Sequence, residues 1–140
     1  MINRLIIIIA LLILSSCTVN NNMDNKFMIR FGSCYNSDKV SLYINEKKIF
    51  KDLIIKTDDE LDLTPIRVTC SFDNIIKVYN KKEVIFSNKI ILDKTISLYI
   101  QKNNKIQKKI ISLSKGKSFV IDGCNNYIQI NQFSNKIVYD

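Results

Sequence analysis

The chain has 140 residues, of which 21 are Lys or Arg and 13 are Asp or Glu, so its formal net charge is +8. It contains no histidine and only three glycines, which removes the commonest general base and zinc ligand and excludes a glycine-rich phosphate loop. No nucleic-acid recognition motif accompanies the charge, so no nucleic-acid partner is expected. The lysines are interpreted as a solvated surface, with a functional basic patch as the alternative.

The N-terminal segment joins one basic residue to an apolar run that ends in a cysteine. Arg4 precedes ten apolar residues, 5–14, and the sequence LSSC then ends at Cys17. Ten helical residues rise about 15 Å, whereas the hydrocarbon core of a bilayer is roughly 30 Å thick, so this run is too short to span it. A basic start, a short apolar run and a small-residue exit are typical of a secretory signal.

The sequence LSSC resembles the lipobox of bacterial lipoproteins, and the resemblance covers residues 1–17 only. It implies that a signal peptide, residues 1–16, is cleaved and that the Cys17 thiol receives a diacylglyceryl group. Two acyl chains attach a protein stably to a membrane. Residues 17–26 then form a lipidated, polar tether, and Thr18 favours the outer membrane where the cell has one. The alternative is an ordinary signal with an incidental cysteine.

From Phe27 onward, short apolar runs alternate with polar turns. Runs rich in isoleucine, valine, tyrosine and threonine recur about every 8–12 residues, which indicates an all-β domain. Residues 27–140 are predicted to form one antiparallel β-sandwich, immunoglobulin-like in general architecture, with about eight or nine strands. In the run 66–72, the alternation predicts four side chains on one face, namely Ile66, Val68, Cys70 and Phe72.

Three cysteines remain beyond the lipobox. Cys34 and Cys124 lie in the turn-like sequences GSCYNSD and DGCNN, whereas Cys70 lies inside an apolar run, where a thiol packs as a small apolar group. A disulfide is permitted outside the cytoplasm. The pair Cys34–Cys124 is favoured, although spacing alone leaves the other pairings open.

The sequence SLYI occurs twice, at 41–44 and at 97–100. Each copy leads into a polar turn and a second apolar run, so two similar hairpins are expected, through duplication or through convergence. Tyr43 and Tyr99 lie opposite the aliphatic faces of their strands. If these strands are neighbours, the tyrosines form an exposed aromatic platform for a sugar or a partner. The alternative is packing against another layer or against lysine stems.

Four carboxylates gather in the sequence TDDELDL, namely Asp58, Asp59, Glu60 and Asp62. Carboxylates can bind calcium, but the spacing does not fit an EF-hand loop, whose glycine is also missing. A solvated acidic loop with at most one helical turn is expected. No metal site and no cofactor are predicted.

These features favour a lipid-anchored protein of the cell envelope that is not an enzyme and has no catalytic residues. It is expected to be a binding or structural module with an envelope protein or a glycan as its partner. The alternative is an inhibitor or immunity-type lipoprotein that acts on a secreted protein. A hydrolase that uses carboxylates or a thiol is the third hypothesis, and the missing histidine disfavours it.

Overall fold

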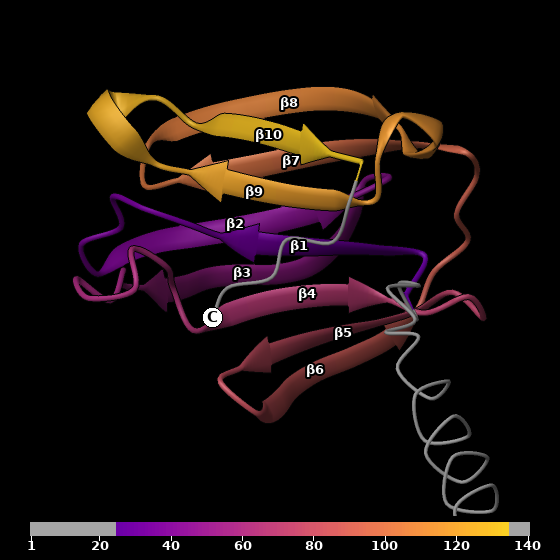
Figure 1. Cartoon of the computed structure of the whole chain (residues 1–140), viewed down its shortest axis with the longest axis horizontal. Helices are drawn as coiled ribbons and strands as arrows, with labels where there is room; N and C mark the ends of the chain where they lie inside the picture. Colours follow the sequence, from indigo (N-terminus) through magenta and orange to yellow (C-terminus); the bar gives the residue numbers. More distant parts are fainter. Residues whose placement is uncertain (1–24, 135–140) are drawn as a thin grey trace, which may run out of the picture.

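A computed structural model describes residues 25–134 of the chain. Within this range, ten strands form two β-sheets that pack face to face (Figure 1). The all-β sandwich predicted from the alternating pattern is confirmed. The predictions for the signal peptide, for Cys17 and for most of the tether concern residues outside the described range. Across residues 25–134, no helix has both the length and the apolar character needed to cross a membrane.

The larger sheet contains six strands, in the spatial order β10 (Gln129–Phe133), β9 (Ser118–Asp122), β1 (Phe27–Phe31), β4 (Ile66–Cys70), β5 (Ile75–Asn80) and β6 (Glu83–Lys89). The smaller sheet contains four, in the order β3 (Lys47–Ile55), β2 (Asp38–Ile44), β7 (Thr95–Lys102) and β8 (Lys105–Ser112). Short 3-10 helices, η1 (Leu113–Lys115) and η2 (Cys124–Asn126), flank β9. The described strand pairs are antiparallel, as predicted, except for β1–β9, which is parallel; the prediction of antiparallel pairing is wrong for this pair.

The described range holds ten strands, whereas about eight or nine were predicted, and the strands at the sheet edges have the weakest sequence pattern. Strands β6 and β8 lie at the edges of their sheets, and most of their side chains are exposed. A strand that buries little of either face shows only a weak alternation of apolar and polar residues. In β8 the outward residues Ile106 and Ile110 are apolar and are 57% and 72% exposed, which obscures the pattern further.

The core lies between the two sheets. Strand β1 contributes Phe27, Ile29 and Phe31, and the opposite sheet contributes Leu42 and Leu98, all of them fully buried. Burial of a side chain of this size stabilises the fold by about 1.5–3 kcal/mol. The dense interior holds the strands at fixed positions, so the side chains on the outer faces keep a fixed spacing.

Phe72 does not lie in the core, contrary to the alternation predicted for residues 66–72. Strand β4 ends at Cys70, and Phe72 is 63% exposed. A tight turn follows the strand, in which the Ser71 hydroxyl donates to the Ile75 carbonyl at 3.1 Å and accepts from the Ile75 N–H at 3.2 Å. Asn74 supports the turn with a left-handed φ of 65°. Because the strand ends before Phe72, its alternation does not extend to this residue, and the turn directs the Phe72 side chain outward.

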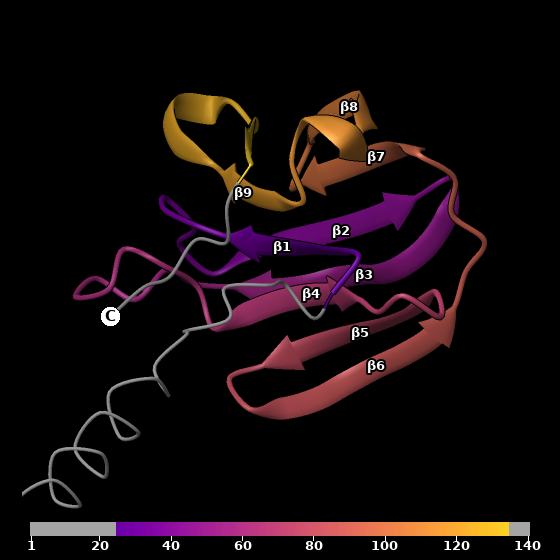
Figure 2. The same ribbon diagram turned by 45° about the vertical axis from the view of Figure 1, so that its right-hand side comes forward.

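The loops gather at the two ends of the sandwich (Figures 1 and 2). The end at which β1 begins, on the right of Figure 1, is called the N-terminal end. It comprises residues 25–27, 44–47, 70–75, 89–95, 112–118 and 133–134. The opposite end is called the disulfide end. It comprises residues 32–39, 55–66, 80–83, 102–105 and 122–129.

Candidate ligand-binding face

The two copies of SLYI become neighbouring central strands of the smaller sheet. Strands β2 and β7 are antiparallel, and Tyr43 lies directly opposite Tyr99. Their ring centroids are 5.4 Å apart and the ring planes form an angle of 86°, which is an edge-to-face contact. Both rings are half-buried on the outer face of the sheet. The structure thus brings together the two tyrosines that the sequence suggested as a platform.

Two lysines extend the tyrosine pair into a row across the sheet. Lys48 of β3 lies opposite Tyr43, and Lys108 of β8 lies opposite Tyr99. Residues in direct register across strands have their side chains on the same face. We call Lys48, Tyr43, Tyr99 and Lys108 the Lys-Tyr row.

A shallow hollow of about 270 Å³ lies against three residues of the Lys-Tyr row, but not against Lys48. It is lined by Tyr43, Glu46, Ser97, Tyr99 and Lys108. The hollow thus combines aromatic surface, hydroxyl groups, an ammonium group and one carboxylate. Aromatic side chains with a polar tip bind ligands that have both an apolar face and hydrogen-bonding groups.

Asparagines hold the two strands that carry the tyrosines in register. At one end of the β2–β7 pair, Asn45 donates its N–H to the Ser97 carbonyl at 2.9 Å and accepts from the Ser97 N–H at 2.8 Å through Oδ1. At the other end, Asn103 bonds Lys39 in the same way, at 2.7 and 3.0 Å. Both asparagines have a φ of 50°, a conformation that asparagine tolerates well. Hydrogen bonds from an asparagine thus hold the β2–β7 pair, which carries the tyrosines, at each of its two ends.

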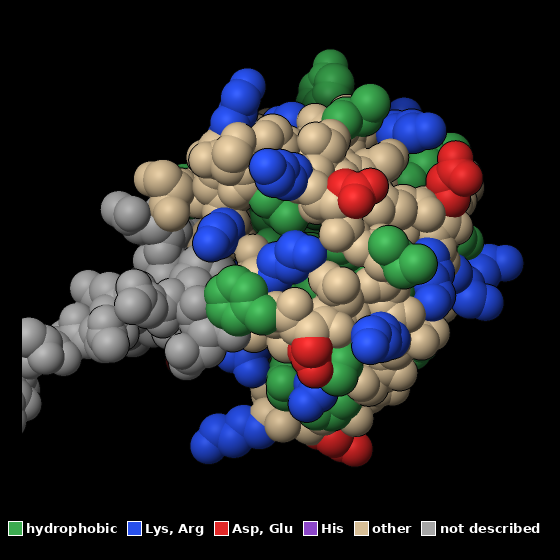
Figure 3. Space-filling view, turned by 90° about the vertical axis from the view of Figure 1, so that its right-hand side faces the viewer, with side chains coloured by type: hydrophobic (Ala, Val, Ile, Leu, Met, Phe, Trp, Pro, Cys, Tyr) green, Lys and Arg blue, Asp and Glu red, His purple; other side chains and the backbone are tan. Residues whose placement is uncertain are grey.

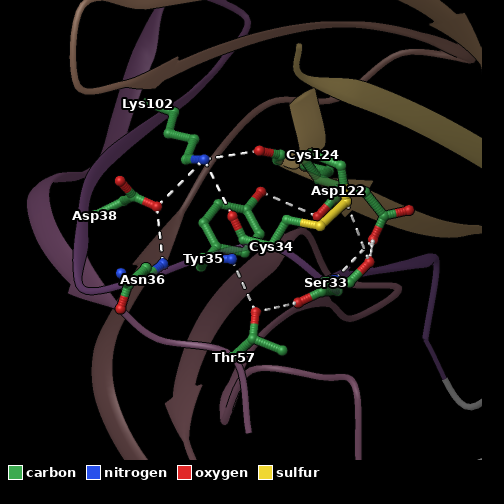
Figure 4. The surroundings of a disulfide bond; sticks show 12 residues. Ser33, Cys34, Tyr35, Asn36, Asp38, Thr57, Lys102, Asp122 and Cys124 are labelled. Atoms are coloured by element: carbon green, nitrogen blue, oxygen red, sulfur yellow. Dashed lines mark hydrogen bonds and ion pairs between the residues drawn. A yellow bond between two sulfur atoms is a disulfide. The ribbon is translucent and has the colours of Figure 1, made fainter. Parts of the chain in front are cut away.

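The disulfide end is built around a bond between Cys34 and Cys124, which are 90 residues apart (Figure 4). This is the pairing that the turn-like sequences favoured. The third described cysteine, Cys70, is free and fully buried. Burial raises the pKa of its thiol to about 11.

Lys102 of β7 links the two loops that the disulfide joins (Figure 4). Its Nζ donates to the carbonyl oxygens of Cys34 at 3.1 Å and Gly123 at 2.7 Å, and it forms an ion pair with Asp38 at 3.2 Å. An ammonium group has three N–H donors, and here each has an acceptor. Lys102 therefore stabilises this end of the molecule and leaves no donor for a ligand.

Two other ionisable groups at the disulfide end are also committed to structure. Asp122 Oδ1 accepts hydrogen bonds from the Ser33 N–H at 2.9 Å and the Ser33 hydroxyl at 3.2 Å. The Tyr35 hydroxyl donates to the Ile121 carbonyl at 3.0 Å. Burial, together with the charges of Asp122 and Asp38, raises the pKa of Tyr35 far above its ordinary value. The phenol thus remains protonated and acts as a buried hydrogen-bond donor.

The acidic segment forms a turn rather than a helix. Asp58 Oδ1 accepts from the backbone N–H groups of Glu60 at 2.9 Å and Leu61 at 3.3 Å, so this carboxylate stabilises its own loop. Asp58, Asp59 and Glu60 line one side of a broad groove that also contains arginines and lysines, whereas Asp62 does not line it. No group of three or more His, Cys, Asp or Glu residues within 25–134 is placed to hold a metal ion.

Comparison of the chain with models of protein families, with curated protein sequences and with solved structures found no significant match. The site is therefore interpreted from its own geometry. The sequence suggested the tyrosines, but it did not predict the part played by Lys48, Lys108 or Lys102. Hairpin register would have found Lys108, because a two-residue turn at 103–104 fixes its partner as Tyr99.

Proposed function

We propose that this protein is an exported, lipid-anchored and non-catalytic binding module of the bacterial cell envelope. Its binding surface is the outer face of the smaller sheet, and the observation that carries this proposal is the Lys-Tyr row. The resemblance of residues 1–17 to a lipobox supports attachment through Cys17. A disulfide between Cys34 and Cys124 fits an oxidising compartment outside the cytoplasm.

The Lys-Tyr row fits an acidic glycan. Lys48 and Lys108 flank the aromatic pair, and Glu46 is the one carboxylate among the residues that line the hollow. The ring surfaces offer packing for the apolar face of a sugar, and the ammonium groups attract carboxylate or phosphate substituents. The hollow is shallow, which suits a chain lying across the sheet better than a small enclosed molecule.

Three of the described carboxylates are used within the fold, which supports binding rather than catalysis. Asp38 is paired with Lys102, Asp122 bonds Ser33, and Asp58 stabilises its own turn. A general acid or base has to reach a substrate, and these groups are already held by neighbours in the fold.

A second function, inhibition of a secreted protein, is favoured by the edge strand β8. This strand has no partner on its outer side among the described strands, and Ile106 and Ile110 are exposed beside Lys108. Exposed sheet edges bind extended segments of other proteins through backbone hydrogen bonds. Lys105, Lys108 and Lys109 on the same strand limit self-association and favour an acidic partner.

The test is binding of the purified protein to polygalacturonate, a polyanionic glycan, with neutral dextran as the reference. We expect the double variant Tyr43→Ala/Tyr99→Ala to bind polygalacturonate about tenfold more weakly, a loss of about 1.4 kcal/mol. Lys48→Gln/Lys108→Gln, which keeps the tyrosines, is expected to remove most of the salt dependence.

The matched control is Tyr127→Ala, which removes an exposed tyrosine at the disulfide end. It is expected to bind as the wild type does. Equal binding by the wild type and the tyrosine double variant contradicts the proposed site. A photocrosslinker at position 110 that forms an adduct with one stoichiometric secreted protein, without glycan binding, supports the inhibitor function instead.

A further inference from the structure

We infer that the N-terminal end of the sandwich is a membrane-contact surface that lies against anionic lipid headgroups. The inference rests on the proposed lipid attachment at Cys17. It goes beyond that attachment because it states which part of the folded domain touches the bilayer. Charge, exposed apolar side chains and the place where strand β1 begins support it.

The two ends of the sandwich differ in charge. Each end has six lysines, but the N-terminal end has three carboxylates and the disulfide end has seven. The charged residues at the N-terminal end are Lys26, Lys47, Lys89, Lys94, Lys115 and Lys117, together with Glu46, Asp73 and Asp93. This end therefore has a formal excess of three positive charges, and the disulfide end has one excess negative charge. Lysines near an anionic leaflet are attracted to its headgroups.

Ile91 projects from the N-terminal end because its neighbours are fixed. It is 89% exposed, whereas Ile90 and Leu92 on either side are buried at 4% and 7%. The Ile90 N–H donates to the Asn74 carbonyl at 3.0 Å, and the Leu92 carbonyl accepts from Lys26 Nζ at 3.3 Å. With both neighbours held in the core, the extended backbone directs Ile91 to the outside.

Phe72 is the second apolar side chain at this end. It is 63% exposed in the turn fixed by Ser71, and Lys117 Nζ lies 5.9 Å from the centre of its ring. A fixed, exposed aromatic ring beside lysines is a combination found at membrane interfaces, where the ring enters the headgroup region and the ammonium groups meet phosphates. Figure 3 looks onto this end and shows blue Lys and Arg side chains interspersed with exposed green hydrophobic ones and with fewer red Asp and Glu side chains.

The start of strand β1 also favours this end. Residues 18–24 separate Cys17 from Asn25, and seven residues span at most about 25 Å. Strand β1 begins at the N-terminal end, so acyl chains on Cys17 hold this end nearest to the bilayer. The Lys-Tyr row lies on the outer face of the smaller sheet, directly beside this end, and Glu46 belongs both to the loop 44–47 and to the lining of the hollow.

A single fluorophore can test this orientation because the chain contains no tryptophan. Phe72→Trp places one indole at the N-terminal end, and Tyr127→Trp places one at the disulfide end as the matched control. Each full-chain variant is purified from membranes and reconstituted into vesicles of phosphatidylglycerol and brominated phosphatidylcholine. We expect bromine to reduce the fluorescence of the Phe72→Trp variant by at least half and to leave the Tyr127→Trp variant unchanged.

A charge reversal separates the surface from the anchor. In the Phe72→Trp background, Lys94→Glu/Lys117→Glu is expected to abolish most of the quenching. The control pair Lys82→Glu/Lys105→Glu at the disulfide end is expected to retain it. Equal quenching of both indoles, or no quenching of either, overturns the inference.

Incorporation of labelled palmitate distinguishes this failure from failure of the proposed function. A protein that carries lipid on Cys17 but shows no quenching of the Phe72→Trp variant overturns the membrane-contact surface alone. A wild-type protein that takes up no label, and is unaffected by Cys17→Ala, contradicts the lipid anchor and this inference with it.

Discussion

At the scale of single residues, Lys102 and Asp38 show how few side chains organise the disulfide end. Partial burial opposes ionisation of Asp38. Hydrogen bonds from the Asn36 N–H, from the Asn103 side chain and from Lys102, together with the positive charge of Lys102, outweigh this effect and lower the pKa of the carboxyl group. Ionised Asp38 therefore stabilises the folded state.

The lowered pKa of Asp38 predicts a specific acid sensitivity. A depressed pKa gives stability that is complete above the unfolded value of about 3.9 and is lost as pH falls through the folded value. Asp38→Asn is expected to lower the free energy of unfolding by at most about 1 kcal/mol at pH 7, since water screens the pair, and by less below pH 4. Urea unfolding at pH 7 and pH 3, with Asp59→Asn as the control, measures the difference. If the wild type and Asp38→Asn differ by the same free energy of unfolding at pH 7 and pH 3, the lowered pKa of Asp38 is contradicted.

The free thiol of Cys70 gives a second prediction at this scale. It is buried in β4 and its pKa is about 11, so little thiolate exists at pH 8 and reagents do not reach it. We expect iodoacetamide to leave Cys70 unmodified in the folded protein and to modify it in 8 M urea. Mass spectrometry of the peptide that contains Cys70 measures this. Equally fast modification in both states would show that β4 opens readily.

At the scale of elements, the asparagines that close the β2–β7 ladder decide whether the tyrosines stay in register. Asn103 takes part in four hydrogen bonds: two with Lys39, one from its Nδ2 to Asp38 Oδ1 at 2.6 Å, and one from Gln101 Nε2 to its carbonyl oxygen at 3.0 Å. Its left-handed φ is tolerated by asparagine and glycine and is unfavourable for residues such as alanine. The side chain and the backbone conformation thus act together at this position.

Asn103→Ala is expected to lower the free energy of unfolding by about 1–3 kcal/mol, through lost hydrogen bonds and the unfavourable φ. Asn103→Gly removes only the side-chain hydrogen bonds and tolerates the left-handed φ, so its stability is expected to lie between those of the wild type and Asn103→Ala. Asn104→Ala, in the same turn, is the matched control and is expected to change stability little. Urea unfolding followed by circular dichroism measures all three, and a neutral Asn103→Ala contradicts the role of the ladder.

Strands that are marked by a local sequence pattern could be predicted, whereas pairings between distant segments could not. The alternation in SLYI was sufficient to predict β2 and β7 and the faces of Tyr43 and Tyr99. The parallel pairing of β1 with β9 joins segments about 90 residues apart, and no local pattern encodes it. Phe72 was misplaced because a turn of four residues, fixed by Ser71, overrides the alternation of the strand before it.

At the scale of the whole molecule, the sandwich could be predicted from the sequence, but the difference in charge between its two ends could not. The charge of each end sums contributions from loops scattered along the chain, and only the order of the strands brings those loops together. The composition shows an excess of lysines, but it does not show where in the fold these lysines lie. The Lys-Tyr row has the same origin, since Lys48 and Lys108 are 60 residues apart and meet the tyrosines only through the pairing of four strands.

The position of β1 also has a mechanical consequence. Strand β1 lies between β9 and β4 in the larger sheet and is hydrogen-bonded to both of them along its length. A force that pulls the N-terminus outward along this strand loads its hydrogen bonds to both neighbours in shear, so they must yield together rather than one at a time. Directly beyond the strand, Cys34 passes the remaining load to Cys124 through a covalent bond. The strand nearest the tether is thus the one best placed to resist extraction from the domain.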